Sequence, residues 1–146
     1  MDASPRQQRQ ARQEGGHDIR IRHFRYNAFV IEDSGIKIAV DPGQNLWLFD
    51  LRSLIPKEEW ETVTHVLVTH GDPDHYWQAD RVALKANAPL IVNKSMVREV
   101  DDESHILAPR RGGLRYVPYK GRLQPVDVGD SIELDGVHFE AIAAQH

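Results

Sequence analysis

VTHVLVTHGDPDHYW, residues 63–77, carries the clearest structural pattern in the sequence. Its opening part, 63–69, is mostly β-branched and apolar, which is typical of a strand buried on both faces. A helix is expected from near His75 to about Ala86, followed by a short buried strand over 89–93. The segment 63–93 therefore predicts a strand–loop–helix–strand unit, with its polar loop at the carboxyl end of a parallel strand.

The loop at the end of that strand has the residue types of a metal site. His70, Asp72, Asp74 and His75 can converge on a small volume, because the glycine and proline among them hold the loop tight. Imidazole nitrogen and carboxylate oxygen suit zinc, iron or manganese. Two aspartates this close repel each other unless a cation lies between them. The alternative interpretation is an acidic surface loop whose aspartates cap the following helix.

Composition narrows the class of protein. The chain has 146 residues, 18 Lys+Arg against 22 Asp+Glu, and a net charge of -4. This balance argues against a general nucleic-acid binder, and no run of residues has the apolar length of a membrane span. The absence of cysteine excludes disulfides, thiolate zinc sites and cysteine nucleophiles. Any metal must therefore be held by nitrogen and oxygen.

Two regions are expected along the chain. Residues 1–16, rich in Gln and Arg, predict a disordered polar tail, and 17–146 predict one domain. The tail is too polar for a secretory signal, so we expect a cytoplasmic protein.

Weaker patterns predict the remaining elements. Asp135-Gly136 between two alternating runs indicates a hairpin, and Ser95 is expected to cap a helix that continues to Val100. The Pro/Gly/Arg-rich stretch 108–121 is expected to connect elements. The other expected elements are strands over 19–22, 27–31, 36–40, 124–128, 131–134 and 137–144, and a helix over 57–62.

The segment 69–75, THGDPDH, resembles the H-x-H-x-D-H signature of the metallo-β-lactamase-fold superfamily, which follows a strand ending in Thr. VDPG at 40–43 resembles that family's first motif. AFVIEDSGIKIAVDPG at 28–43 looks like the opening hairpin of its ascorbate-phosphate-lactonase-like branch. The resemblance covers 19–146 and implies an α/β fold, the N-terminal part of an αββα sandwich built from two pseudo-equivalent halves.

The resemblance also implies a ligand set. His70 and His146 would bind a first metal, and Asp74 and His75 a second. Asp74 would in addition be the catalytic residue, which positions the attacking hydroxide or hands a proton to the leaving group. Asp41 would be a carboxylate that orients the site.

One ligand position departs from the family pattern. Asp72 stands where the family usually has histidine, and in the flavodiiron branch an acidic residue at this position binds iron. Asp72 therefore remains a candidate metal ligand, and it favours harder cations.

The function implied is that of a metal-dependent hydrolase. One or two ions, zinc first and iron or manganese as alternatives, would lower the pKa of a bound water from about 15.7 toward about 7. The substrate would be a small-molecule ester, lactone, amide or phosphoester. One alternative is a di-iron oxidoreductase of the same fold. The other is an incomplete, non-catalytic half-domain that needs a complementing C-terminal half or a second copy of the chain.

Other residues are expected to be structural. His65 is predicted to be packed and hydrogen-bonded within its strand. Trp77 is expected in the core and Tyr76 at the rim of a cleft. The arginines at 110, 111 and 115 are expected on a solvated loop, with an anion-binding patch as the alternative.

Overall fold

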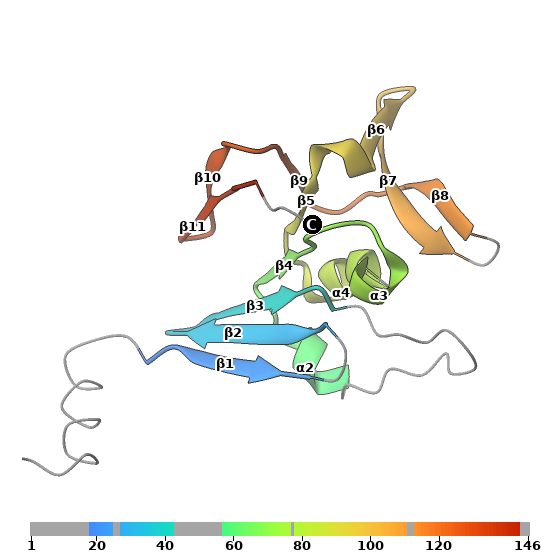
Figure 1. Ribbon diagram of the computed structural model, residues 1–146. Coiled ribbons are helices and arrows are strands. Elements are labelled where there is room, and N and C mark those ends of the chain that lie inside the picture. Colours follow the sequence, from blue (N-terminus) through green and yellow to red (C-terminus); the bar gives the residue numbers. More distant parts are fainter. Residues whose placement is uncertain (1–17, 25–26, 43–56, 77, 111–112, 144–146) are drawn as a thin grey trace, which may run out of the picture.

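The computed structural model describes residues 18–24, 27–42, 57–76, 78–110 and 113–143 (Figure 1). The predicted tail, 1–16, lies outside these ranges. The elements are β1 (Arg20–His23), β2 (Phe29–Asp33), β3 (Ile36–Val40), α2 (Lys57–Glu61), β4 (His65–Leu67), α3 (Pro73–Tyr76), α4 (Ala79–Ala86), β5 (Leu90–Asn93), the 3₁₀ helix η1 (Lys94–Met96), β6 (Val97–Val100), β7 (Glu103–Arg110), β8 (Gly113–Pro118), β9 (Leu123–Val126), β10 (Ser131–Leu134) and β11 (Val137–Glu140).

The main sheet has six strands in the order β1-β2-β3-β4-β5-β9. Strands β1, β2 and β3 run antiparallel, and β3, β4, β5 and β9 run parallel. A tight turn joins β2 to β3 because Ser34 and Gly35 both adopt positive φ, 47° and 85°, as a two-residue hairpin loop requires. The predicted α/β class and the strand–helix–strand unit over 63–93 are confirmed.

The core lies between this sheet and the helices. Val30, Ala39, Val66 and Leu90 stand side by side across β2, β3, β4 and β5, and all four are fully buried. Helix α4 packs on β4 and β5, so the apolar row on that face of the sheet is covered (Figure 1). No helix in these described ranges is long and apolar enough to cross a membrane.

The helix expected from His75 to Ala86 is two helices. Helix α3 ends at Tyr76, and α4 begins at Ala79. Gln78 precedes α4 with φ −117° and ψ 31°, outside helical values, so the chain changes direction before α4 starts. The prediction of one continuous helix is therefore wrong, and residues 73–75 lie on α3, a short helix of their own.

The helix expected after Ser95 is also wrong. Asn93, not Ser95, is the cap: its side chain accepts a hydrogen bond from the Ser95 amide at 2.8 Å and starts the single turn η1. Residues 97–100 then form β6, because its β-branched ends pair across to β7.

The connecting stretch expected over 108–121 is largely strand. β8 pairs over its whole length with residues 105–110 of β7 and completes a three-stranded sheet, β6-β7-β8. Proline and glycine within the stretch masked this pattern, since both are depleted in strands. Proline is tolerated where it stands in β8 because that strand is at the edge of its sheet.

The β10–β11 hairpin is confirmed, with Asp135 and Gly136 at φ 47° and 83°. His65 fastens it to the main sheet. Its Nε2 lies 2.8 Å from the carbonyl oxygen of Leu134, its Nδ1 lies 2.8 Å from Thr64 Oγ1, and its ring packs on Phe139. His65 is fully buried, so its predicted role as a packed, hydrogen-bonded residue is confirmed.

Candidate metal site

Two neighbouring parallel strands end at the site. Asp41 follows β3, and the loop that begins at Thr69 follows β4. The Asp41 amide donates to the Leu67 carbonyl at 2.9 Å, which ties the two strand ends together. The carboxyl ends of parallel strands meet at one edge of a sheet, which is where open α/β sheets place ligands.

Asp41 is the buried centre of this edge, with 4 % of its surface exposed. Its carboxylate accepts hydrogen bonds from the Thr69 amide at 2.7 Å, from Thr69 Oγ1 at 2.6 Å and from His75 Nδ1 at 2.8 Å. Its φ of 45° is a conformation that costs about 1–3 kcal/mol for a non-glycine residue. Three hydrogen bonds to one buried carboxylate offset that cost and the cost of its desolvation.

These bonds set the tautomer of two imidazoles. Because an ionised carboxylate only accepts, Thr69 Oγ1 gives its single proton to Asp41, and His75 donates from Nδ1. Thr69 Oγ1 then accepts from His70 Nδ1, 3.0 Å away. In both histidines Nε2 is therefore the nitrogen that a metal would take, with a carboxylate oriented behind each ring, directly or through Thr69.

His70, Asp72 and His75 lie together at this edge. The two imidazole rings are tilted by 47° with centroids 3.9 Å apart, and His70 Nε2 lies 3.2 Å from Asp72 Oδ2. Their side chains are 32 %, 71 % and 22 % exposed for His70, Asp72 and His75, so the site opens to solvent on the Asp72 side. A cation entering from solvent would meet imidazole nitrogen and carboxylate oxygen first.

The remaining predicted ligands lie outside what the structure describes. Asp74 belongs to α3, but its side chain and the whole of His146 fall outside the described residues. Within the described ranges, no three histidine, aspartate or glutamate side chains converge closely enough to hold a metal ion. The donor chemistry fits a zinc, iron or manganese ion, and the full ligand set of His70, Asp72, Asp74, His75 and His146 stays a prediction.

Three expectations about neighbouring residues need correction or fall outside the description. Tyr76 is fully buried rather than at a cleft rim, because its side chain belongs to the hydrophobic core. Arg110 is no solvated loop residue: its guanidinium pairs with the buried Asp80. Trp77 and Arg111 lie outside the described residues.

Thr69 contacts both Asp41 and His70, whereas the sequence indicated it only as the end of a strand. A hydroxyl residue placed between a buried strand and the first histidine was the available signal. Its role depends on Asp41, which is 28 residues away in the chain, so the pairing could not be read from local sequence.

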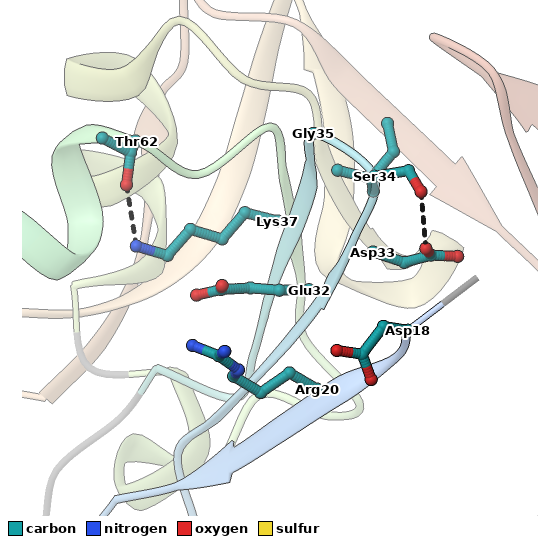
Figure 2. Close-up of a pocket in the computed structure, with 9 residues that line it drawn as sticks. Asp18, Arg20, Glu32, Asp33, Ser34, Gly35, Lys37 and Thr62 are labelled. Atoms are coloured by element: carbon teal, nitrogen blue, oxygen red, sulfur yellow. Dashed lines mark hydrogen bonds between the residues drawn. The ribbon is translucent and has the colours of Figure 1, made fainter. Parts of the chain in front are cut away.

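A polar cavity of about 470 Å³ lies elsewhere, beside the β2–β3 turn (Figure 2). Arg20, Glu32 and Lys37 line it, and Lys37 Nζ donates to Thr62 Oγ1 at 2.7 Å. This turn is at the amino end of β3, whereas Asp41 follows its carboxyl end. The cavity is therefore at the opposite edge of the sheet and takes no part in the candidate metal site.

The chain matches one family model and several curated proteins. The family model described as Metallo-beta-lactamase superfamily matches residues 22–146. A UPF0173 metal-dependent hydrolase of Pyrobaculum neutrophilum is 28% identical over 131 residues, which are 88% of this chain and 51% of that protein. A UPF0173 metal-dependent hydrolase of Chelativorans is 37% identical over 82 residues, 51% of this chain and 31% of that protein.

One solved structure agrees at the level of the fold. Igni18, a metallo hydrolase from the archaeon Ignicoccus hospitalis, superposes with a TM-score of 0.52 at 18% identity, over 80% of this chain and 43% of that one. The chain spans about half the length of the curated relatives it matches.

Proposed function

The chain belongs to the metallo-beta-lactamase superfamily, and on that premise we propose that it carries the first metal-binding motif of a metal-dependent hydrolase. The Asp41–His75 hydrogen bond of 2.8 Å carries this proposal. A buried carboxylate that accepts a hydrogen bond from Nδ1 and so fixes the ring is the arrangement that supports metal-binding histidines.

The residues have separate roles. A divalent metal, when bound, would lower the pKa of a water and polarise a carbonyl or phosphoryl oxygen of the substrate. His70 and His146 would hold a first ion and Asp74 and His75 a second, the imidazoles of His70 and His75 through Nε2, with Asp72 as a further candidate ligand. Asp41 keeps both imidazoles in the binding tautomer. Asp74 would orient the attacking water or give a proton to the leaving group.

The substrate proposed is a small-molecule ester, lactone, amide or phosphoester. The relatives named above support hydrolysis, since their names describe metal-dependent hydrolases. Zinc is the first choice of metal. The carboxylate of Asp72, 3.2 Å from His70 Nε2, favours iron as the second choice and with it a di-iron oxidoreductase. Visible absorbance of the loaded protein separates the two, because zinc is colourless.

The test is zinc content by elemental analysis after reconstitution and desalting. We expect about one equivalent or less in the wild-type chain, since a zinc site uses about four donor groups and the loop 70–75 offers two histidines and two aspartates. His75→Ala should remove most of this zinc. His138→Ala is the control, because His138 is half exposed on the β10–β11 hairpin.

His65→Ala provides a second control inside the sheet. This variant breaks the hydrogen bond to the Leu134 carbonyl and should lower the melting temperature, yet the folded protein should keep its zinc. Loss of zinc in His65→Ala with retention in His75→Ala would refute the assignment. A wild-type chain that takes up neither zinc nor iron would refute the proposed function itself.

A further inference from the structure

A buried polar cluster includes Tyr76, the residue that follows the candidate ligand His75. Tyr76, Asp80, Arg110 and Tyr119 come from α3, α4, the end of β7 and the segment after β8. Asp80 is 3 % exposed, Tyr76 is fully buried and Tyr119 is 5 % exposed. The Arg110 guanidinium pairs with Asp80 Oδ2, so the ion pair joins α4 to β7 in a region that is otherwise apolar.

The cluster is tightly packed around the two tyrosine rings. Burial is the main cause that raises the pKa of Tyr76, and the negative charge of Asp80 adds to this effect. Burial raises the pKa of Tyr119 to about 12, and Asp80 adds to this effect, so both phenols stay protonated at neutral pH. A Cβ added at Gly121 would lie 2.6 Å from the Tyr119 hydroxyl oxygen, so the absence of a side chain at Gly121 leaves room for that ring.

The buried polar groups of this cluster lower the stability of the folded chain. Four buried side-chain polar atoms in the described part of the chain make no hydrogen bond, and three of them are the Tyr76 hydroxyl, Asp80 Oδ1 and the Tyr119 hydroxyl. Apolar residues of similar volume fill such a space without these unmet hydrogen bonds and without a desolvated ion pair. The cluster therefore calls for a role beyond filling the core.

The position of Tyr76 suggests that role. It follows His75 directly on the one-turn helix α3, and the amides of both residues donate to the Asp72 carbonyl at 2.9 Å. Helix α3 packs against β7, where Arg110 is the last residue. His75 is thus held from two sides, by Asp41 at its ring and by the buried Tyr76 along its backbone.

We propose that the Asp80–Arg110 ion pair positions the imidazole of His75, with the buried Tyr76 ring as the link between them. This role rests on the proposed metal site, because His75 matters here as a ligand. Asp80 and Arg110 are positioning residues and touch neither metal nor substrate.

The first measurement uses the metal-free full chain labelled with ¹⁵N-histidine. Long-range ¹H–¹⁵N spectra report which ring nitrogen of each histidine carries the proton. Wild type should show His75 as a single tautomer with the proton on Nδ1. Asp80→Asn should give averaged shifts for His75 and leave His65 unchanged. Asp135→Asn is the matched control, because it removes an equivalent carboxylate from the exposed Arg122–Asp135 pair.

The second measurement is zinc affinity by competition with a chelator. Asp80→Asn should weaken binding by about tenfold, at the low end of the effect of removing an outer partner of a metal ligand. Arg110→Lys keeps the positive charge beside Asp80 and should weaken zinc binding less than Asp80→Asn does. Asp135→Asn should bind as wild type does.

The outcomes separate this inference from the proposed function. If Asp80→Asn lowers the melting temperature but keeps the single His75 tautomer and zinc affinity within twofold of wild type, the pair is only structural and the inference fails. A wild-type His75 without a single tautomer would overturn it too. If zinc does not bind at all, the proposed function fails, and the spectra alone decide the positioning role.

Asp80→Asn leaves Arg110 partly buried without its partner and could unfold the chain. In that event Asp80→Asn/Arg110→Gln, which removes both charges, replaces it, with the same two readouts and the same deciding outcomes.

Discussion

At the scale of single residues, Asp41 has the largest influence on the candidate site. Its carboxylate accepts two hydrogen bonds from Thr69 and one from His75, and it is nearly inaccessible to solvent. A carboxylate differs here from an amide of the same shape, because it accepts hydrogen bonds and donates none.

Asp41→Asn tests this difference. The new amide group can donate to His75 Nδ1, which moves the ring proton to Nε2, the nitrogen that a metal would take. We expect zinc affinity to fall by about 10- to 100-fold, as for other partners of metal-binding histidines. Chelator competition measures the affinity, and the ¹⁵N spectra of His75 report the tautomer.

Thr69 supplies the matched pair of variants for the same idea. Thr69→Ser keeps the hydroxyl between Asp41 and His70 and should bind zinc nearly as wild type does. Thr69→Val keeps the shape and loses the hydroxyl, so zinc affinity should fall. Equal affinities for the two variants would show that the tautomer of His70 is set by something else.

At the scale of elements, a bidentate ion pair joins α2 to β1. Arg22 Nη1 and Nη2 each lie 2.7 Å from a carboxylate oxygen of Glu59, and Lys37 Nζ lies 3.2 Å from the same group. The hydrogen bond from Arg22 is the main cause that lowers the pKa of Glu59 from its ordinary value of 4.5. The pair fixes a short helix that has little intrinsic stability of its own.

The lowered pKa gives a pH dependence with a definite sign. Glu59 contributes stability above its ordinary pKa of 4.5, and this contribution is lost as pH falls through the lower pKa of the folded state. Glu59→Gln should therefore lose about 1 kcal/mol at pH 7. The difference from wild type should shrink below pH 4.5 and vanish in stronger acid. Urea unfolding at a series of pH values measures both.

Glu61→Gln on the same helix is the control. The Glu61–Lys85 pair is 3.8 Å apart and almost half exposed, so its loss should change stability little at any pH. The assignment would be contradicted if the free energy of unfolding of Glu59→Gln differed from that of wild type by the same amount at every pH.

At the scale of the whole molecule, the two faces of the main sheet differ. The face that carries Val30 and Val66 is covered by helices. On the other face Ile21, Ile31, Ile38 and His65 stand in register across four strands. The β10–β11 hairpin packs over His65 through Phe139, while Ile21 is 65% exposed. This apolar row is therefore covered at the end beside β4 and open at the end beside β1.

That incomplete cover leads to a prediction about activity. The curated relatives are about twice as long as this chain, and we propose that a complete site needs that length or a second copy. The 146-residue chain loaded with zinc should therefore hydrolyse esters, lactones and phosphoesters weakly. Steady-state rates on a panel of such substrates measure this. Robust hydrolysis by a chain verified as monomeric would show that these 146 residues are sufficient.

The sequence by itself determined the features that depend on neighbouring residues. The β-branched run before Thr69, the Asp-Gly turn at 135–136 and the histidines and aspartates of 70–75 each carry their signal within a few positions. Only the tertiary structure decided the rest, because the partners are far apart in the chain. Asp41 meets Thr69 and His75, Asp80 meets Arg110, and β7 recruits 97–100 and 113–118 into strands that local propensity did not favour. These contacts form when folding buries groups that are far apart in the chain, so no local sequence pattern predicts them.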